Sequence, residues 1–357
     1  MRIRRITADW LHVPIPEAKQ HTTDFGRIAS FDSALVRVEA EGGFVGYGEA
    51  KAAVGSAGTN AALVTCIEQE LAPLIEGEDA RDISRLWDVM YNGSRAHFAI
   101  ARGHAFPILG RRGLAVAGLA GIDIALWDIL GKSLGVPVWR LLGGRRQARM
   151  PAYASGGWAP ADRIAAELKR FIERGDFKAV KMRVGAGDGT LAHSIARVRA
   201  ARDGLGEAID IMCDAHGTWT VAEAKRFCRE VAACNIGFRD LVELRAVDIL
   251  QPDLSIAGGI TEALRIEALA SAHQLRFAPH LWGGALTFAA GLQVAAVASS
   301  GFILEYSLGA NPMLHELALE DFPVVDGHVE IPDRPGLGVT IDEAFVARHR
   351  VPVASRS

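Results

Sequence analysis

Ionisable residues stand at the ends of several short apolar stretches that predict β-strands. Asp253 ends one such stretch, and His280 ends the next along the chain. A carboxylate that accepts a hydrogen bond from an imidazole fixes its tautomer and raises its basicity, which suits a general base near neutral pH. We therefore predict that Asp253 and His280 lie on neighbouring strands as a hydrogen-bonded pair in which His280 accepts a proton.

Further charged residues end three other strands. Lys181 and Arg183 end the same strand, and Glu305 ends the last one. Asp214 ends a third, and His216 follows it by two positions, so these two side chains leave the strand end on one side. A carboxylate suits a hard cation such as Mg²⁺, although Mg²⁺ is seldom held by one protein carboxylate without help. Asp214 is therefore a candidate metal ligand that needs partners from elsewhere.

Alternating short strands and helical stretches position these residues after Met150. Repeated βα units imply a parallel sheet, and this many favour a closed (β/α) barrel, which has eight strands. Functional side chains in such barrels gather at the C-terminal ends of the strands, where the ionisable residues stand. We predict seven strands, at residues 151–155, 179–184, 209–214, 235–238, 248–254, 276–280 and 302–306.

The N-terminal part of the sequence has a different pattern. Alternating apolar residues predict strands, and apolar residues at three- and four-residue steps predict helices, so this part is typical of an α+β domain. We expect strands at 2–13, 34–40 and 44–49, and helices within 60–92 and at 118–134. The predicted division is an N-terminal α+β domain (1–125), a barrel (126–325) and a C-terminal segment (326–357) that packs back on the first domain.

Composition limits the possible partners and location. The 357 residues carry a net charge of −3, which argues against binding to nucleic acid or to an anionic membrane. We expect no apolar run of transmembrane length, and the first residues lack the apolar core of a signal peptide. The four cysteines show no CxxC spacing, so reduced thiols in a cytoplasmic protein are expected.

One long motif resembles a known family. Residues 117–132 (AGLAGIDIALWDILGK), followed by Pro137 and by LLGG at 141–144, closely resemble the signature helix of the mandelate racemase branch of the enolase superfamily. The strand-end residues then occur in the family's order, as KMR, DAH, QPD, PH and LEY. The resemblance covers nearly the whole chain, including the N-terminal domain.

The resemblance implies a modified (β/α) TIM-type barrel with an N-terminal capping domain, and Mg²⁺ that binds the carboxylate of a small substrate. A base would then remove the proton α to that carboxylate, and the cation would stabilise the enolate. By similarity, Asp214 is the first metal ligand, and His280 with Asp253 is the base. Glu305 would donate a hydrogen bond to the substrate carboxylate. A homo-oligomer is expected.

The sequence departs from the family between Asp214 and Asp253. The family has two more acidic ligands, at the ends of its fourth and fifth strands, and neither of their motifs occurs here. Asp253 follows Asp214 by only 39 positions, whereas three βα units of roughly 30 residues each need about twice that length. We predict that about one βα unit is missing between Phe238 and Arg239, by natural deletion or by omission from this sequence. Asp240 and Glu243 are weaker alternative ligands.

The residue types favour one reaction of this family. Two-base racemases of the family use a lysine where Arg183 stands, and a guanidinium is a poor base because it is effectively always protonated. A one-base pathway fits better: His280 takes the α-proton, and His216 or protonated His280 gives a proton to the departing β-hydroxyl. The product would be a 2-keto-3-deoxy acid, as in the sugar-acid dehydratases that the DAH motif resembles. Lys181 would point towards the metal or substrate oxygens.

Substrate contacts and alternatives remain open at this stage. His21, in a polar segment at 21–26, and Trp282 are the expected substrate-binding residues besides Glu305. A cycloisomerase or epimerase that uses the same enolate is the second hypothesis, since PHLWG at 279–283 also resembles lactone cycloisomerases. A non-catalytic protein without metal is the third, if the internal gap is real.

Overall fold

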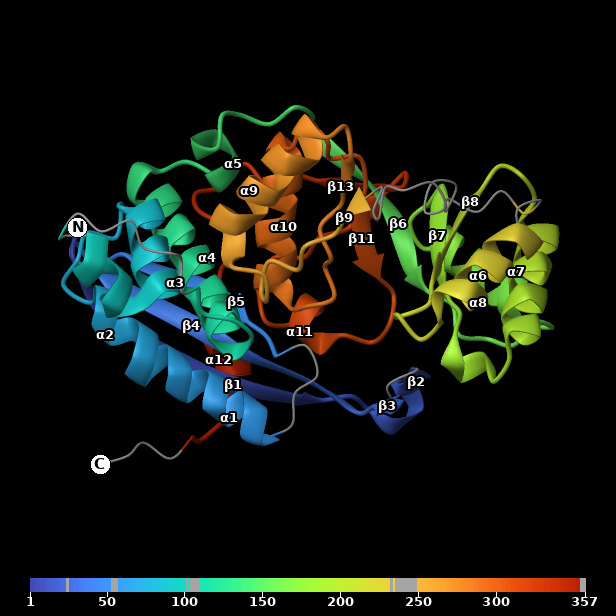
Figure 1. Ribbon diagram of the computed structural model, residues 1–357, viewed down its shortest axis with the longest axis horizontal. Helices are drawn as coiled ribbons and strands as arrows, with labels where there is room; N and C mark the ends of the chain where they lie inside the picture. Colours follow the sequence, from blue (N-terminus) through green and yellow to red (C-terminus); the bar gives the residue numbers. More distant parts are fainter. Residues whose placement is uncertain are drawn as a thin grey trace.

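The computed structural model describes residues 1–23, 26–52, 57–100, 102, 110–231, 234 and 249–353, apart from the side chains of 21–23, 57–58 and 94–100. An α+β domain and a strand-rich region flanked by helices lie side by side (Figure 1). The N-terminal strands are β1 (Ile3–Pro14), β2 (His21–Thr23), β3 (Gly26–Ile28), β4 (Ser30–Ala40) and β5 (Val45–Ala50). The N-terminal helices are η1 (Glu17–Lys19), α1 (Ala57–Thr65), η2 (Cys66–Leu71), α2 (Ala72–Ile75), α3 (Ile83–Ile100), α4 (Leu114–Leu134) and α5 (Val138–Leu141).

The N-terminal sheet has the strand order β14-β1-β4-β5, where β14 (Arg350–Val351) comes from the C-terminal segment, and it is antiparallel throughout. Helix α4 lies directly on β5, because Gly46 and Gly48 leave room for its backbone. A Cβ atom at either glycine would collide with a backbone oxygen of α4, that of Ala125 or of Gly121. The three strands predicted for this domain are therefore confirmed, with small shifts at their ends.

Helix α4 differs from the sequence-based prediction in its start, and it contradicts the expectation that no apolar run reaches transmembrane length. It begins at Leu114 rather than at 118, and it is long and apolar enough to cross a membrane by length and composition. However, 72% of its most apolar stretch is buried inside the protein. Its apolar surface packs against the sheet and neighbouring helices, as expected for a core helix. It ends as predicted, with Gly135 in the left-handed conformation.

The second region carries the predicted βα units. Its strands are β6 (Arg149–Gly156), β7 (Ala179–Arg183), β8 (Asp210–Asp214), β9 (Ile249–Leu250), β10 (Arg276–Phe277) and β11 (Leu304–Ser307). Its helices are α6 (Ile164–Glu173), η3 (Ala186–Asp188), α7 (Leu191–Leu205), α8 (Val221–Glu230), α9 (Gly259–Ala272), α10 (Ala285–Val297) and α11 (Pro312–His315). Six of the seven predicted strands are therefore present. The remaining one, predicted at 235–238, falls in the part of the chain that is not described.

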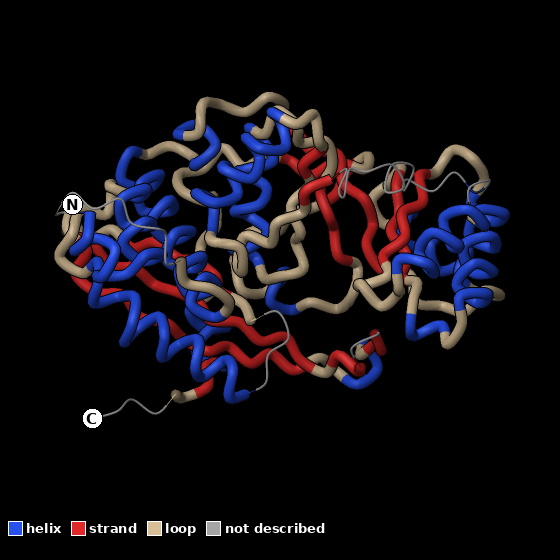
Figure 2. Tube along the Cα trace, in the orientation of Figure 1, coloured by secondary structure: helices blue, strands red, loops and turns tan. Residues whose placement is uncertain are grey.

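The barrel strands form two parallel groups (Figure 2). One group has the order β11-β6-β7-β8, and the other pairs β9 with β10. Within the described residues, no strand ladder joins β8 to β9. Strand β9 is also shorter than expected, with two residues instead of the seven predicted at 248–254. The fold is thus a mixed α/β fold consistent with a cap and a TIM-type barrel, and the missing βα unit stays a prediction.

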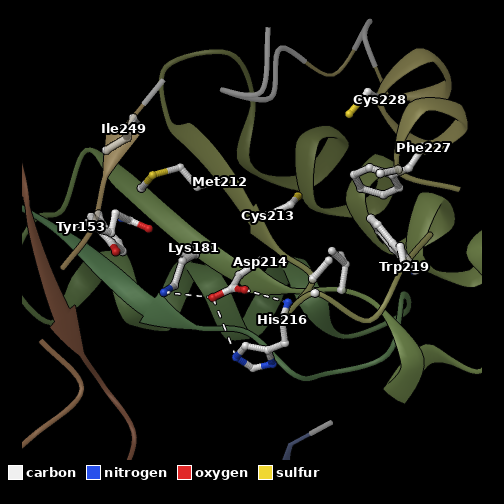
Figure 3. Close-up of a pocket in the computed structure, with 15 residues that line it drawn as sticks. Tyr153, Lys181, Met212, Cys213, Asp214, His216, Trp219, Phe227, Cys228 and Ile249 are labelled. Atoms are coloured by element: carbon white, nitrogen blue, oxygen red, sulfur yellow. Dashed lines mark hydrogen bonds and ion pairs between the residues drawn. The ribbon is translucent and has the colours of Figure 1, made fainter. Parts of the chain in front are cut away.

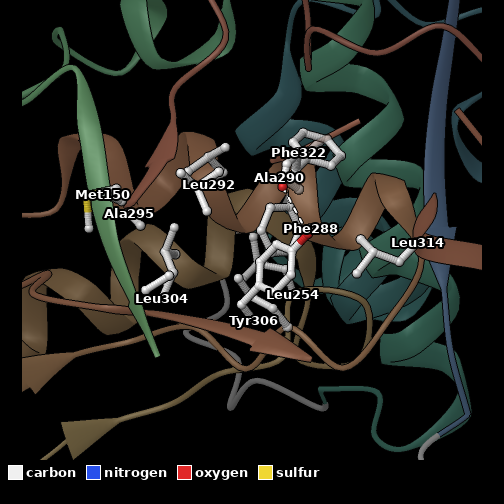
Figure 4. Packing of buried hydrophobic residues seen from close by; sticks show 14 of the residues in the cluster. Met150, Leu254, Phe288, Ala290, Leu292, Ala295, Leu304, Tyr306, Leu314 and Phe322 are labelled. Carbon is white, nitrogen blue, oxygen red and sulfur yellow. Dashed lines mark hydrogen bonds between the residues drawn. The ribbon is translucent and has the colours of Figure 1, made fainter. Parts of the chain in front are cut away.

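A dense apolar core fixes the last strand and the helix before it (Figure 4). Phe288 of α10 packs edge-on against Tyr306 of β11 and also contacts Phe322. The Tyr306 hydroxyl donates a hydrogen bond to the carbonyl oxygen of Phe322 at 3.0 Å. These contacts hold β11, and with it Glu305, against the segment that follows His280.

The C-terminal segment reaches both regions. It contains β12 (Val324–Val325), β13 (His328–Glu330), α12 (Glu343–His349) and β14 (Arg350–Val351). Strand β14 pairs with β1 of the N-terminal sheet, whereas β13 pairs with the barrel strand β6. The segment therefore packs on the barrel as well as on the first domain. The predicted boundary at residue 125 falls inside α4, and the exact division of domains stays a prediction.

Candidate active site

The structure brings Asp253 and His280 together at adjacent strand ends. Nδ1 of His280 lies 2.8 Å from Oδ2 of Asp253, and a parallel bridge joins the two residues. Oδ1 of Asp253 accepts hydrogen bonds from the amide and hydroxyl of Ser255, at 3.0 and 2.6 Å. Burial raises the pKa of Asp253, but Lys51, His280 and Ser255 together lower it further, so the net pKa lies below its usual value. Asp253 is therefore an anion that can orient the His280 ring.

Asp214 lies among cations at the end of β8 (Figure 3). Its Oδ2 contacts Nη1 of Arg183 closely and lies 3.3 Å from Nζ of Lys181. Its Oδ1 accepts a hydrogen bond from the amide of His216 at 3.0 Å, and the His216 ring lies 3.9 Å from Oδ2. Although burial raises the pKa of Asp214, Lys181 and Arg183 lower it further, so it falls below the usual value.

Glu305 is a buried carboxylate, with 1% of its side chain exposed. It accepts hydrogen bonds from Nζ of Lys181 at 2.6 Å, from the Ser155 hydroxyl at 2.7 Å and from the Leu281 amide at 3.2 Å. Burial alone would raise the pKa of Glu305, but Lys181 and the other donors lower it below its usual value. Glu305 is therefore an acceptor in this structure, and the donor role implied by the family resemblance requires that it first take up a proton.

Lys181 links the two carboxylates, because it contacts both Asp214 and Glu305. His280 also faces this group, with Nε2 3.8 Å from Oε2 of Glu305. Its side chain is 36% exposed, which leaves the ring accessible to a small molecule. The predicted residues of β7, β8, β10 and β11 thus surround one region at the C-terminal ends of the strands.

Of the other two expected substrate-binding residues, the structure describes the side chain of Trp282 but only the backbone of His21. The Trp282 ring lies 5.9 Å from the ring of Phe31 in the N-terminal domain, centre to centre. His21 pairs through its backbone with Ile28 in the β2–β3 hairpin. The side chain of His21 is outside the described part of the structure, so its contact with a substrate stays a prediction.

Sequence reasoning missed several residues that complete this site. Lys51, directly after β5, donates to Oδ2 of Asp253 at 2.9 Å. Glu49, at the end of the same strand, accepts from the amides of Gly284 and Thr287 in the segment after His280. The Ser155 hydroxyl donates a hydrogen bond to Glu305, and the Ser255 hydroxyl donates one to Asp253. Glu49 and Lys51 alternate along one strand, but that local pattern does not reveal a partner in the other domain.

A cavity of about 420 Å³ lies beside Asp214, between β8, α8 and β9 (Figure 3). Most of its lining is apolar, and it includes residues of both β8 and β9. The lining residues include Met212, Trp219, Phe227, Ile249 and Gln251. The cavity therefore lies between β8 and β9, which no strand ladder joins in the described part of the chain.

The residues in the described part do not by themselves fit a Mg²⁺ site. Within that part, no group of three or more His, Cys, Asp or Glu side chains could hold a metal ion. Asp214 supplies one carboxylate, but Arg183 and Lys181 already occupy its Oδ2. Mg²⁺ prefers about six oxygen ligands in octahedral geometry, so one such carboxylate is insufficient. Asp240 and Glu243, the alternative ligands, belong to the segment that is not described.

The fold and site define a cap-and-barrel protein with a histidine–aspartate pair and a lysine-linked carboxylate pair at its strand ends. The chain belongs to the mandelate racemase/muconate lactonizing enzyme family. The N-terminal domain of that family matches residues 5–143, and the enolase C-terminal domain-like region matches residues 163–238 and 236–345. This confirms the family resemblance read from the sequence.

Relatives cover most of the chain. An arabinonate dehydratase from Saccharolobus solfataricus is 31% identical over 353 residues, covering 88% of this chain and 89% of the relative. A D-galactarolactone cycloisomerase from Agrobacterium fabrum is 31% identical, covering 89% of this chain and 91% of the relative. The structure of a racemase from Streptomyces coelicolor A3(2) with bound magnesium superposes with a TM-score of 0.81 at 28% identity, covering 98% of this chain and 100% of that one. The chain is thus similar to acid-sugar dehydratases and cycloisomerases in general.

Proposed function

We propose that this protein is a sugar-acid dehydratase that converts an aldonate or aldarate to a 2-keto-3-deoxy acid. The observation that carries the proposal is the hydrogen bond between His280 and Asp253, which prepares an accessible imidazole to accept a proton. The dehydratase among the relatives supports the choice of reaction. Arg183 supports a one-base pathway, because its guanidinium is bound to Asp214 and is a poor base.

The proposed reaction has two bond-breaking steps. His280 takes the proton on the carbon next to the substrate carboxylate, and the electron pair of the C–H bond moves into an enolate. The C–O bond at the β-carbon then breaks, and the hydroxyl leaves as water with a proton from His216 or from protonated His280. The resulting enol becomes the 2-keto acid by taking up a proton on carbon and releasing the proton of its hydroxyl. Asp253 stabilises the protonated His280 ring, and Lys181 places a positive charge near the substrate oxygens.

A cycloisomerase is the second candidate. The galactarolactone cycloisomerase relative and the PHLWG sequence at 279–283 favour it. Both reactions begin with the same proton transfer to His280, so the residues at the strand ends do not separate them. The change in mass does, because dehydration of an open-chain sugar acid releases water, whereas a cycloisomerase converts a lactone to an isomer of the same mass. Both routes can end in a 2-keto acid, so mass spectrometry of substrate and product distinguishes the two.

We also propose that the complete enzyme uses Mg²⁺ and that this chain lacks about one βα unit between Phe238 and Arg239. The C-terminal family region supports this, since its two matches share residues 236–238 at the proposed junction. The alignment to the arabinonate dehydratase is 353 positions long, more than the 88% of this 357-residue chain that takes part in it. Some positions of that relative therefore have no counterpart here. The cavity beside β8 supports the same location.

The test compares two proteins: the 357-residue chain, and the same chain with a segment of about 30–40 residues restored between Phe238 and Arg239. The segment should carry the two acidic motifs expected for the family's fourth and fifth strands. Each protein is titrated with Mg²⁺ by calorimetry and incubated with a panel of aldonates and aldarates.

We expect the present chain to bind Mg²⁺ weakly, on the order of millimolar, and to form little 2-keto acid. The restored chain should bind Mg²⁺ stoichiometrically and turn over. Tight Mg²⁺ binding and rapid turnover by the 357-residue chain would show that the ligands lie elsewhere. A restored chain that binds Mg²⁺ but makes no 2-keto acid from any sugar acid would refute the dehydratase assignment.

A further inference from the structure

The end of strand β5 in the N-terminal domain contacts the segment that carries His280. Glu49 is buried, and its two carboxylate oxygens accept hydrogen bonds from the amides of Gly284 and Thr287, at 2.9 and 3.1 Å. These amides lie at the start of α10, where backbone N–H groups lack partners within the helix. The N-terminal domain therefore fixes the start of α10, five residues after His280.

Lys51 makes a second set of contacts from the same strand end. Its amide donates to the carbonyl oxygen of Ser255 at 3.1 Å. Its Nζ donates to Oδ2 of Asp253 at 2.9 Å and also, at close range, to the carbonyl oxygen of Trp282. Only 13% of the Lys51 side chain is exposed. The ammonium group therefore links the N-terminal domain to Asp253, the partner of the His280 ring, and to Trp282, two residues after His280.

Lys51 and His280 share one oxygen atom. Nδ1 of His280 lies 2.8 Å from the same Oδ2 of Asp253 that accepts from Lys51. The ammonium and the ring nitrogen are therefore at most about 6 Å apart, a separation at which charges in a partly buried site interact strongly. A fixed positive charge there opposes the charged form of the ring.

Two carboxylates lie near the His280 ring, and each of them is paired with a lysine. Asp253 lies against Nδ1, and Glu305 lies 3.8 Å from Nε2. Two unscreened carboxylates would hold the ring in its protonated form, which cannot accept a proton. Lys181 is paired with Glu305 at 2.6 Å, and Lys51 is paired with Asp253 at 2.9 Å. Each carboxylate therefore has its own lysine.

We propose that Lys51 is a positioning residue for His280: it shares Asp253 with the ring, holds the Trp282 carbonyl, and keeps the ring neutral to lower pH than Asp253 alone would allow. The link to catalysis rests on the proposed role of His280 as the base. The electrostatic coupling itself does not depend on that role. Lys51 would thus connect the N-terminal domain to the base.

The test follows the His280 ring by NMR as the pH is changed in the 357-residue chain, with its signal assigned by its loss in His280→Asn. Lys51→Met removes the charge and keeps a side chain of similar length. We expect the midpoint of the ring titration to rise by about one pH unit, because a positive charge near the ring is lost. Lys51→Arg should stay near the wild-type midpoint, and Lys178→Met, an exposed lysine, should leave it unchanged.

A midpoint in folded Lys51→Met equal to that of the wild type would overturn the proposal. If Lys51→Met does not fold, the wild-type chain with ¹⁵N-labelled lysine provides the test. The Lys51 ammonium signal should then shift with the same midpoint as the His280 ring, and a Lys51 signal that is flat through that midpoint also overturns the proposal. Neither measurement needs substrate, metal or turnover, so failure of the dehydratase assignment would leave this result intact.

Discussion

Lys181→Met should destabilise the folded protein, because it leaves a buried carboxylate without its counter-charge. Nζ of Lys181 lies 2.6 Å from Glu305 and 3.3 Å from Asp214. Water cannot replace the lysine at Glu305, since that side chain is almost fully buried. Methionine has a similar length and volume, so the change removes the charge with little change in packing.

The size of the stability loss depends on the hydrogen bonds and charges that remain around Glu305 and Asp214. Removal of one partner from a buried ion pair costs about 3–5 kcal/mol. Glu305 keeps hydrogen bonds from Ser155 and the Leu281 amide, and Asp214 keeps Arg183. We therefore expect a loss near the lower end, about 3 kcal/mol of unfolding free energy at pH 7.

Urea denaturation followed by circular dichroism measures this loss. Lys178→Met is the matched control, because Lys178 pairs with Asp176 at 2.8 Å but is 69% exposed. That control should lose less than about 1 kcal/mol. Lys181→Met combined with Glu305→Gln should recover most of the stability, since no buried charge is then left unpaired at that position. If Lys181→Met lost no more stability than the control, the ion pair would not contribute as argued.

The same ion pair predicts a pH dependence. Burial raises the pKa of Glu305, but Lys181 and the other donors lower it further, so the folded value lies below that of the unfolded chain. A carboxylate of this kind adds stability above its unfolded pKa, and the added stability is lost as the pH falls through the folded value. The stability difference between wild type and Lys181→Met should therefore shrink below about pH 4, since Glu305 can take up a proton more easily in the variant. A difference that grows on acidification would contradict this.

Two further predictions concern the proposed reaction in the chain with the restored segment. His280→Asn should abolish exchange of the substrate α-proton with D₂O while leaving the circular dichroism spectrum unchanged; exchange at the wild-type rate, measured by NMR, would exclude His280 as the base. Arg183→Lys should lower the rate of 2-keto acid formation by no more than about tenfold, or about 1.4 kcal/mol in barrier, since lysine can keep the contact with Asp214. A loss of several orders of magnitude in that assay would show a direct role for the guanidinium.

The strand-end residues could be predicted from the sequence because of a property of parallel sheets. The C-terminal ends of successive βα strands meet at one edge, so the order of strands suffices to group Asp253 with His280 and Lys181 with Asp214. The contacts of Lys51 and Glu49 could not be predicted in this way. Their partners are 202 and 235 positions away in the chain, in the other domain, and no periodicity connects them.

Element boundaries were predicted less well where packing decides them. The helical pattern at 60–92 is divided in the structure among α1, the π-helical turn η2, α2 and α3. Strand β9 keeps only two of its expected residues, because a strand is defined by its neighbours and no ladder joins β9 to β8 in the described part. The sequence indicates that these residues can be extended, but only the packing shows how far they pair.

The charges at the strand ends help to explain why Asp214 alone is a poor metal site. Lys181 and Arg183 together neutralise Asp214 and Glu305, so this group carries no net charge. A divalent cation at Asp214 would meet repulsion from both basic side chains and would have to displace Arg183 from Oδ2. Two further carboxylates would bring two negative charges, which match a divalent cation and leave the balance unchanged. The two acidic residues that the proposed βα unit would carry would therefore balance the charge of the cation as well as supply ligands.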